Sequence, residues 1–452
     1  PNMLVSCMND AGTDAVPDPF WNPQFSQFCY TFQYMPGAIT YLDTPVEPIA
    51  AFASPITYPT DCEQPTTTPV IASVTRDTLD GPYALPGETI LVASMGLTQV
   101  DNPDWDGTTT TTRKISRDYS FNNCTVELED EAGIRTALVG TTSCSATQAS
   151  GDVPALAAGP YQVVVTNGDG TESPIGATLQ VGPYANNRNI WRVPGDFATI
   201  QGAIDAAGAG DLILVAPKLD SAGNLLSYDE LVVMWKPVKL QGWGAGAVTI
   251  NARQVPTEKI ANWRIKVEQL LADGLIDQLP GQDNLPGFAA LAAVVFPTEE
   301  GAGIFVAGPS SGNQSFGNPQ NRGARIDGFS IVGASQGGGI AVNGYAQYLE
   351  IGNNRITGNA GAFSGGIRLG HPQLINEQGN TLSYTDAEND SVRIHHNHIA
   401  RNGGRGGGAG GGLSLHTGAD DYTVVNNWIC GNFSSGSGAG IGHLGLSSRS
   451  VI

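Results

Sequence analysis

Apolar and polar residues alternate in short runs over most of the chain, and glycine, proline or asparagine separates the runs. Between residues 69 and 182, runs such as 86–92 (PGETILV) and 159–166 (GPYQVVVT) lie next to Pro-Gly and Asn-Gly turns. Such short alternating runs are typical of antiparallel strands in a β-sandwich. Residues 1–68 contain a similar run at 25–32. We therefore expect the end of a β-rich module at 1–68 and a sandwich at 69–182.

A repeating pattern occupies the second half of the chain. Four six-residue segments with aliphatic residues at matching positions align: 326–331, 351–356, 394–399 and 424–429. A glycine-led strand follows each of them, at 339–342, 366–369, 412–415 and 440–441. Such self-similarity is typical of a solenoid, in which successive coils stack their strands about 4.8 Å apart. We expect a mostly β protein in which residues 190–452 form a right-handed parallel β-helix.

The alignment predicts which side chains stack inside the solenoid. Ile351, Ile394 and Val424 occupy one aliphatic column. Asn354, Asn397 and Asn427 occupy another column, where their amides can form a hydrogen-bonded ladder. This ladder is expected to be structural.

Two segments have helical spacing. Residues 197–207 place apolar side chains three or four positions apart before a glycine stop, which predicts a helix that caps the open end of the solenoid. Residues 253–300 interrupt the coils, and their part 258–274 has an amphipathic helical pattern. We expect this helix to pack on the flank of the solenoid, with a lid or a subunit contact as alternatives.

Several of these sequence segments resemble segments of known protein families. The closing phrase at 159–168 (GPYQVVVTNG) resembles an IPT/TIG domain, an Ig-like fold of cell-surface and secreted proteins. Residues 25–42 resemble the end of a small Ig-like module. The succession from the cap helix to residue 252 resembles the first coils of pectin-lyase-like β-helix proteins. That resemblance implies a fold that hosts lyases, hydrolases, esterases and epimerases acting on acidic polysaccharides.

The net charge indicates which classes of partner the protein can bind. The chain has 42 acidic and 22 basic residues, a formal net charge of −20. Such a surface repels phosphate backbones, so we expect no nucleic-acid partner. No cofactor is required by any motif, although the acidity is compatible with calcium. The calcium candidates are Asp101, Asp104 and Asp106 in the loop at 100–112, for which a solvated loop is the alternative.

The cysteines favour an oxidising compartment. None of the six forms a CxxC pair, and Cys124 and Cys144 lie within the predicted sandwich, where they could bridge. Three more precede residue 69, for which one pair and one leftover is the simplest arrangement. No stretch is long and apolar enough to span a membrane. The chain starts and stops inside structural patterns, so we expect it to be a piece of a longer polypeptide with an extracellular or cell-surface location.

Candidates for chemistry lie on the outward side of the coils. Arg325, Glu350 and Arg393 share one outward column, and Asp327 and His395 share the next. All six histidines fall between residues 371 and 443, with polar-face histidines as the alternative to a metal or catalytic site. The catalytic candidates are Asp327, Glu350, Arg393 and His395. The polygalacturonase motifs are missing, apart from an Arg-x-Lys triplet at 264–266 inside the predicted helix.

These observations favour a secreted or cell-surface structural or adhesive protein, including a filament or surface-assembly subunit, that uses a rigid β-helix as a binding or assembly surface. The partners expected for it are carbohydrate, other surface proteins or further copies of the chain. One alternative is a polysaccharide-active lyase, epimerase or hydrolase. Another is the non-catalytic part of a larger enzyme whose active domain lies beyond residue 452.

Overall fold

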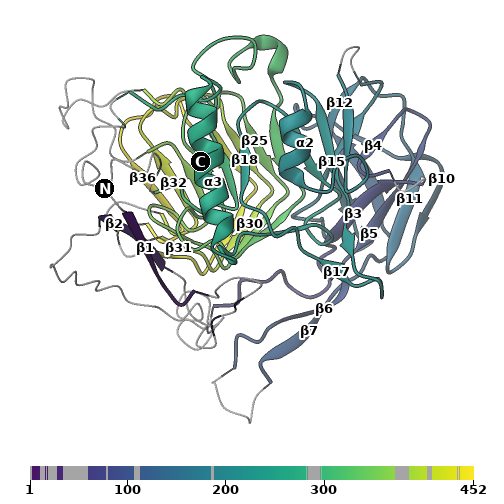
Figure 1. Cartoon of the computed structure of the whole chain (residues 1–452). Helices are drawn as coiled ribbons and strands as arrows, with labels where there is room; N and C mark the ends of the chain where they lie inside the picture. The colour runs from purple at the N-terminus through teal and green to yellow at the C-terminus, as the bar shows by residue number, and fades with distance from the viewer. Residues whose placement is uncertain are drawn as a thin grey trace.

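The computed structural model describes residues 3–10, 16, 18, 28–33, 60–77, 80–105, 112–184, 188–280, 282, 296, 298–371, 386–404, 410–434, 436 and 438–452. Strands dominate this part of the chain, as the sequence predicts. Its helices are α2 (Ile200–Ala206), α3 (Glu258–Ala272) and the short 3₁₀ helix η3 (Pro319–Asn321). In Figure 1 the stacked parallel strands lie on the left and in the centre, and most of the antiparallel strands lie on the right.

Three long parallel sheets, which we name A, B and C, form the larger unit. Sheet A contains β14 (Ile190–Val193), β15 (Leu212–Val215), β19 (Lys239–Gly242), β22 (Arg325–Asp327), β25 (Glu350–Gly352), β29 (Arg393–His395) and β33 (Thr423–Val425). Sheet B contains β20 (Thr249–Asn251), β23 (Ser330–Val332), β26 (Arg355–Thr357), β30 (His398–Ala400) and β34 (Trp428–Cys430). Sheet C contains β18 (Val232–Met234), β21 (Ile304–Val306), β24 (Ile340–Val342), β28 (Ile367–Leu369), β32 (Leu413–His416) and β36 (Ile441–Leu444).

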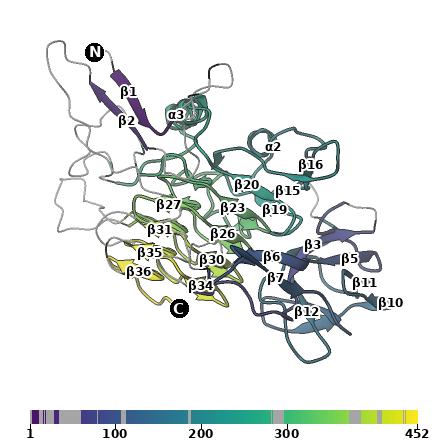
Figure 2. The same cartoon turned by 90° about the horizontal axis from the view of Figure 1, so that it is seen from below.

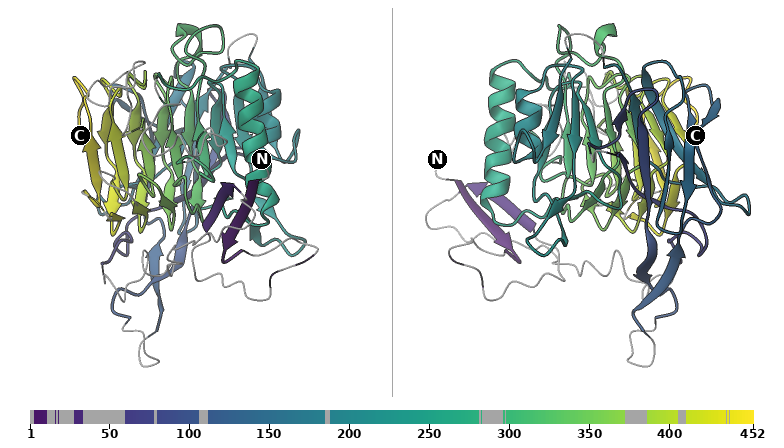
Figure 3. Two further views of the ribbon diagram at one scale, coloured as in Figure 1. Left: turned by 60° about the vertical axis from the view of Figure 1, so that its left-hand side comes forward. Right: turned by 90° about the vertical axis from the view of Figure 1, so that its right-hand side faces the viewer.

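The chain visits these sheets in turn. From β19 onward each circuit adds one strand to A, then one to B, then one to C. In the later circuits a short strand is added at the corner between B and C: β27 (Ala360–Gly361), β31 (Gly403–Gly404) and β35 (Phe433–Ser434). Ile351 pairs in register with Ile394, and Ile394 with Val424, so the predicted aliphatic column is confirmed. The stacked strands are visible from the side in Figure 3.

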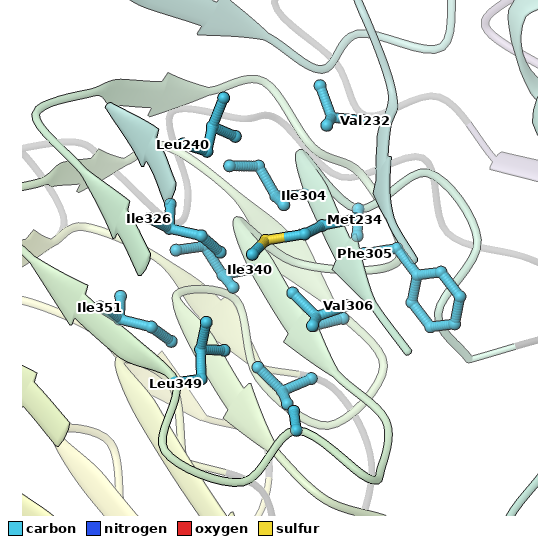
Figure 4. Packing of buried hydrophobic residues seen from close by; sticks show 14 of the residues in the cluster. Val232, Met234, Leu240, Ile304, Phe305, Val306, Ile326, Ile340, Leu349 and Ile351 are labelled. Atoms are coloured by element: carbon cyan, nitrogen blue, oxygen red, sulfur yellow. The ribbon is translucent and has the colours of Figure 1, made fainter. Parts of the chain in front are cut away.

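Side-chain alternation decides what each sheet buries. In the three-residue strands of A and B, the central aliphatic side chain points into the space between the sheets, as Ile326 and Ile351 do in sheet A (Figure 4). In sheet C the first and third residues point inward, and Phe305 at the centre of β21 points away from that space. Residues from all three sheets belong to one buried apolar cluster.

Two stacks of asparagines lie at the sheet corners. Asn354 donates from Nδ2 to Asn397 Oδ1 at 3.1 Å, and Asn397 donates to Asn427 Oδ1 at 2.9 Å. This is the ladder that the alignment placed between A and B. A second stack of Asn359, Asn402 and Asn432 follows sheet B with the same pattern of bonds, and the sequence analysis did not predict it. In both stacks the asparagine side chains form hydrogen bonds with backbone N–H and C=O groups at the turns between the strands.

The two helices cover apolar surface. Thr199 caps α2 by accepting a hydrogen bond from the Gly202 amide at 3.1 Å, so the helix begins later than the 197–207 expected from the pattern. Its buried face contacts β14, β15 and β18 at one end of the parallel sheets. Helix α3 buries Trp263 against Phe305, with ring centroids 5.4 Å apart. It therefore lies on the outer side of sheet C, the flank position that the sequence favoured.

Residues 71–181 form a second, two-sheet unit with its own buried core. One sheet contains β3 (Ile71–Arg76), β5 (Thr89–Ser94), β10 (Val139–Cys144) and β11 (Gln148–Asp152). The other contains β4 (Tyr83–Ala84), β8 (Thr125–Glu129), β9 (Arg135–Ala137), β12 (Gly159–Thr166) and β13 (Thr178–Val181). All neighbours in these sheets are antiparallel except the β4–β13 pair.

Three hairpins complete the described strands: β1 (Met3–Met8) with β2 (Phe28–Gln33), β6 (Gly96–Asp101) with β7 (Lys114–Tyr119), and β16 (Lys218–Leu219) with β17 (Leu225–Leu226). The β6–β7 hairpin extends from the two-sheet unit past the edge of sheet B (Figure 2). The strand at 25–32 is therefore present as β2, whereas the Ig-like resemblance at 25–42 mostly lies outside the described residues.

Candidate functional site

The outward face of sheet A is covered by strand β13 and its neighbours. Asp327 accepts hydrogen bonds from the backbone N–H of Thr178 at 3.0 Å and from its hydroxyl at 2.6 Å. It also accepts from the side-chain amides of Gln241 at 2.6 Å and Asn353 at 2.8 Å. Asp327 is buried, so its charge is stabilised entirely by these four donors. A carboxylate held in this way has no lone pair pointing at open solvent.

Arg325, the other charged residue of β22 on this face, is equally engaged. Its Nε donates to Gln241 Oε1 at 2.8 Å, and both terminal nitrogens donate to Gln180 Oε1 at 3.3 Å. Asn353 completes the network through reciprocal amide bonds with Gln162. We call these seven residues the interface network: Gln162, Thr178, Gln180, Gln241, Arg325, Asp327 and Asn353.

Two glycines let the backbones of the two units approach closely. Val74 in β3 donates a backbone hydrogen bond to Trp243 O at 2.7 Å. A Cβ atom at Gly244 would lie 2.4 Å from Ala72 O, and one at Gly246 would lie 2.7 Å from Ala72 Cα. The loop after β19 therefore needs glycine for a packing reason rather than for a turn alone.

The four catalytic candidates all lie on this covered face. The strand register places Glu350 beside Arg393 in one column, and Gly352 between Asp327 and His395 in the other, as the alignment predicted. Asp327 and His395 are buried, whereas Glu350 and Arg393 are half-buried. Burial raises the pKa of the Glu350 carboxyl.

His395 and His396 belong to the same covered region. Their Nδ1 atoms lie 3.1 Å apart. Desolvation holds the pKa of His395 well below its usual range, and the neighbouring His396 lowers it further. Burial also lowers the pKa of His396. Two neutral rings that share one hydrogen bond fit a packed interface better than a proton-transfer site.

The outward face of sheet C carries a different buried cluster. Arg368 forms an ion pair with Glu299, and its Nη1 donates to Thr298 Oγ1 at 3.2 Å. The ring of Phe363 stacks edge-on against His371, with centroids 5.5 Å apart. Among the described residues, Glu299 Oε2 and Arg368 Nε are buried without a hydrogen-bond partner. This network is thus only half satisfied.

A serine and a histidine meet beside that ion pair. Ser414 Oγ lies 2.8 Å from His416 Nε2, and both side chains are completely buried. Desolvation holds the pKa of His416 well below the usual value, and the charge of Arg368 adds to the effect. A serine with an adjacent neutral histidine is chemically able to act as a nucleophile and base. No approach to Ser414 is open, however, because its exposed fraction is 0%.

An accessible cavity lies elsewhere, between the β6–β7 hairpin and sheet B. It measures about 410 Å³. We call it the hairpin cleft; it is lined by Glu63, Met95, Thr98, Gln99, Val100, Asp101, Lys114, Ala245, Gly246, Thr249, Ser330, Arg355, Thr357, Gly358, Ala400 and Arg401. None of these residues was singled out for binding from the sequence except Asp101. The hairpin and sheet B are far apart in sequence, so no local pattern joins them.

Glu63 lines the hairpin cleft, and its neighbour Cys62 ties this segment to sheet B. Cys62 is bonded to Cys430 of β34, 368 residues away, and Trp428 Nε1 donates to Cys62 O at 2.9 Å. His398 is fully buried in sheet B between the rungs of Arg355 and Trp428. Burial holds the pKa of His398 well below its usual range, the charges of Arg355 and Arg401 lowering it further.

The remaining cysteines form the other disulfides of the described chain. Cys124 is bonded to Cys144, the pair that the sequence left as one option, and Cys7 to Cys29. The leftover cysteine of the N-terminal group is Cys62, whose partner lies in the last coil. This long-range pairing was not foreseen.

The calcium candidates are not assembled into a site in the described residues. Asp101 forms ion pairs with Lys114 and Arg401, Asp104 lies in an exposed turn, and Asp106 lies outside the described residues. Within the described ranges, no three His, Cys, Asp or Glu side chains are placed to hold a metal ion. No helix in that part of the chain has the length and apolarity needed to cross a bilayer.

Comparisons with protein-family models, with curated protein sequences and with solved structures found no significant match to this chain.

Proposed function

We propose that this protein is a secreted or cell-surface structural and adhesive protein. In this proposal, residues 190–452 form a right-handed parallel β-helix and residues 69–182 an Ig-like sandwich fixed to its side. The rigid body formed by the two presents a binding or assembly surface. Chemistry is not its main task.

The β-helix is supported by the cyclic order of sheets A, B and C and by the strand registers that link each circuit to the next. The asparagine stacks occur at equivalent corners of successive circuits, as expected for coils of one repeat. For the Ig-like sandwich, the support is a pair of mainly antiparallel sheets that share one apolar core.

One observation carries the functional proposal: the outward polar residues of sheet A hold the two units together. Asp327 and Arg325 have partners for every side-chain nitrogen and oxygen, and those partners include Thr178 and Gln180 from the two-sheet unit. The same residue types in an enzyme groove would face substrate. A fully satisfied buried network instead fixes one relative orientation of two domains.

An extracellular location is supported by the cysteines. All six are paired, and one pair joins the segment before the sandwich to the last coil. Disulfides persist in oxidising compartments and are rare in the cytosol. A chain that works under load or in dilute surroundings also benefits from a covalent link between its domains.

The experiment has two arms that use the whole chain. Beads coated with the protein are tested for retention on cells and on insoluble polysaccharide matrices, and the soluble protein is incubated with uronate polymers, with and without calcium. We expect retention on at least one surface and no cleavage or epimerisation. Turnover of any polymer would assign the protein to the enzymes, and a lack of retention on every surface would remove the adhesive role.

A further inference from the structure

The hairpin cleft has a continuous chain of charges along one side. Glu63 forms ion pairs with Arg355 at 2.7 Å and with Arg401 at 3.5 Å. Asp101 pairs with the same Arg401 and, at 2.6 Å, with Lys114. Positive and negative groups therefore alternate over five side chains. The Glu63 side chain is only 4% exposed, so the centre of this chain is fixed in place.

The alternation determines the charge of a ligand that would fit. Each cationic side chain already has a carboxylate at contact distance. An anionic ligand would be attracted by the cation and repelled by Glu63 or Asp101, so it would gain little net binding energy. A hydroxyl group donates one hydrogen bond and accepts others. Neighbouring hydroxyls on a neutral ligand can thus donate to the carboxylates and accept from the guanidinium groups together.

The floor of the hairpin cleft determines the shape of that ligand. Thr249, Ser330 and Thr357 come from β20, β23 and β26, three consecutive strands of sheet B. Glycine and alanine fill the neighbouring positions at Gly358 and Ala400. Thr249 and Ser330 pair in register, and Thr357 lies two positions further along its strand than the partner of Ser330. Because successive strands lie about 4.8 Å apart, a linear polymer lying along the stacking axis meets one small polar side chain on each of the three strands.

The opposite wall is polar as well. Thr98 and Gln99 of β6 line it, and the larger apolar side chains there are Met95 and Val100. The described lining includes no aromatic ring. Hot spots for peptides and proteins are rich in aromatic and large apolar anchors, so this lining does not favour such partners. Hydrogen bonds to hydroxyls are the interaction that it offers.

We propose that the hairpin cleft binds a neutral, hydroxyl-rich glycan segment that lies along the stacking axis of sheet B, between the β6–β7 hairpin and strands β20 to β30. This assignment rests on the adhesive function proposed above and identifies the ligand class. The paired charges favour a neutral ligand with many hydroxyl groups. The small side chains of the floor leave room for it along the stacking axis.

The test uses the full-length chain and defined probes. Neutral hexasaccharides of glucose, mannose and galactose with different linkages are compared with oligogalacturonate and a sulfated oligosaccharide, by calorimetry and saturation-transfer NMR. We expect at least one neutral hexasaccharide to bind. Its affinity should stay constant between about 0.05 and 0.5 M salt, because a neutral ligand releases no counterions.

Thr357→Trp fills the floor without removing a side-chain hydrogen bond that the structure shows. It should weaken binding of that hexasaccharide by about tenfold or more, a loss of about 1.4 kcal/mol. Thr141→Trp, on the exposed strand β10 outside the lining, is the matched control and should bind like the wild type. Circular dichroism verifies that both variants are folded.

Three outcomes would overturn the assignment: no neutral hexasaccharide binds, only the anionic probes bind, or Thr357→Trp binds as well as wild type. Bead retention separates this failure from failure of the proposed function. Coated beads that still adhere leave the adhesive role standing and remove only the hairpin cleft as its site. Beads that adhere nowhere remove both.

Discussion

Sheets A and C are covered in opposite ways. The two-sheet unit contacts sheet A through the interface network, in which Arg325 and Asp327 are fully hydrogen-bonded. Helix α3 covers sheet C mainly with apolar contacts, such as Trp263 on Phe305, and the ion pair there leaves Glu299 Oε2 and Arg368 Nε without partners. A polar cover requires each partner at one position, whereas an apolar cover tolerates small shifts. The polar contacts therefore define the position of the two-sheet unit on sheet A more closely than the apolar contacts define that of helix α3 on sheet C.

The largest expected effect concerns the disulfide that joins Cys62 to sheet B. Because Cys62 and Cys430 are 368 residues apart, the chain-entropy model predicts that Cys62→Ser with Cys430→Ser lowers the free energy of unfolding by about 6 kcal/mol. The control, Cys124→Ser with Cys144→Ser, opens a 20-residue separation and should cost about 3 kcal/mol. Urea denaturation followed by tryptophan fluorescence measures both. Equal losses would show that the long link does not restrain the domains.

The next effect tests the polar face directly. Asp327→Ala leaves the buried donors of Thr178, Gln241 and Asn353 without their acceptor, which should cost about 3–4 kcal/mol. Limited proteolysis should then release the two-sheet unit before the parallel sheets unfold. Asp104→Ala, in an exposed turn, is the control. An unchanged unfolding curve for Asp327→Ala would mean that the network does not orient the domains.

A smaller net effect is expected on sheet C. Arg368→Met alone leaves Glu299 buried and unpaired, and should cost about 3 kcal/mol. Adding Glu299→Gln should bring the protein back to within about 1 kcal/mol of wild type, because no buried charge is then left without its partner. The equivalent pair on sheet A, Arg325→Met with Asp327→Leu, should not recover. Recovery on both faces, measured in a double-mutant cycle, would remove the contrast.

The smallest effect is a pH dependence that both faces should share. His416 on sheet C and His395 on sheet A have pKa values well below normal because burial disfavours the charged ring. In the unfolded chain a histidine titrates near 6.5, so below that pH only the unfolded state gains the proton. Stability is complete above pH 6.5 and is lost as pH falls, by up to about 1.4 kcal/mol per pH unit for each ring.

The comparison of variants isolates this effect. Burial and neighbouring acids raise the pKa of Asp390 to about 6, which opposes the histidines as pH falls, but wild type and variants share this group. His416→Asn and His395→Asn should each make the slope of stability against pH shallower between about pH 6.5 and 5.5. Urea midpoints across that range measure the slope. A slope that stays unchanged in His395→Asn would indicate that its ring is charged in the interface.

Much of the parallel unit could be predicted because its information is periodic. Ile351, Ile394 and Val424 recur at one strand position, and so do the asparagines of the first stack. The cover of sheet A could not be predicted. Thr178 and Asp327 are 149 residues apart, and a polar residue on an outward strand position has the same signature whether it meets water, a ligand or another domain. The available signal for a covered face was the presence of two charged residues, Arg325 and Asp327, on the same side of one short strand. Charged residues make up only 14% of the chain.

The hairpin cleft shows the same limit. Its walls come from β6 and sheet B, which are separated by more than a hundred residues. No repeat or motif in the sequence of one wall therefore predicts contact with the other. Asp101 was noted for its acidity and interpreted as a calcium candidate. In the structure that carboxylate has two cationic partners, Lys114 and Arg401. Lys114 lies close to Asp101 in the sequence, whereas Arg401 is 300 residues away, so the sequence gives no sign of that pair.

The bond between Cys62 and Cys430 also constrains the order in which a nascent chain can mature. Cys7 and Cys29, or Cys124 and Cys144, can meet soon after each pair has been synthesised. Cys62 must remain a thiol until its partner, 368 residues later, has left the ribosome and β34 has joined sheet B. Closure of this bond therefore reports that translation has passed β34, and a product truncated before residue 430 would carry a free thiol at its amino-terminal side.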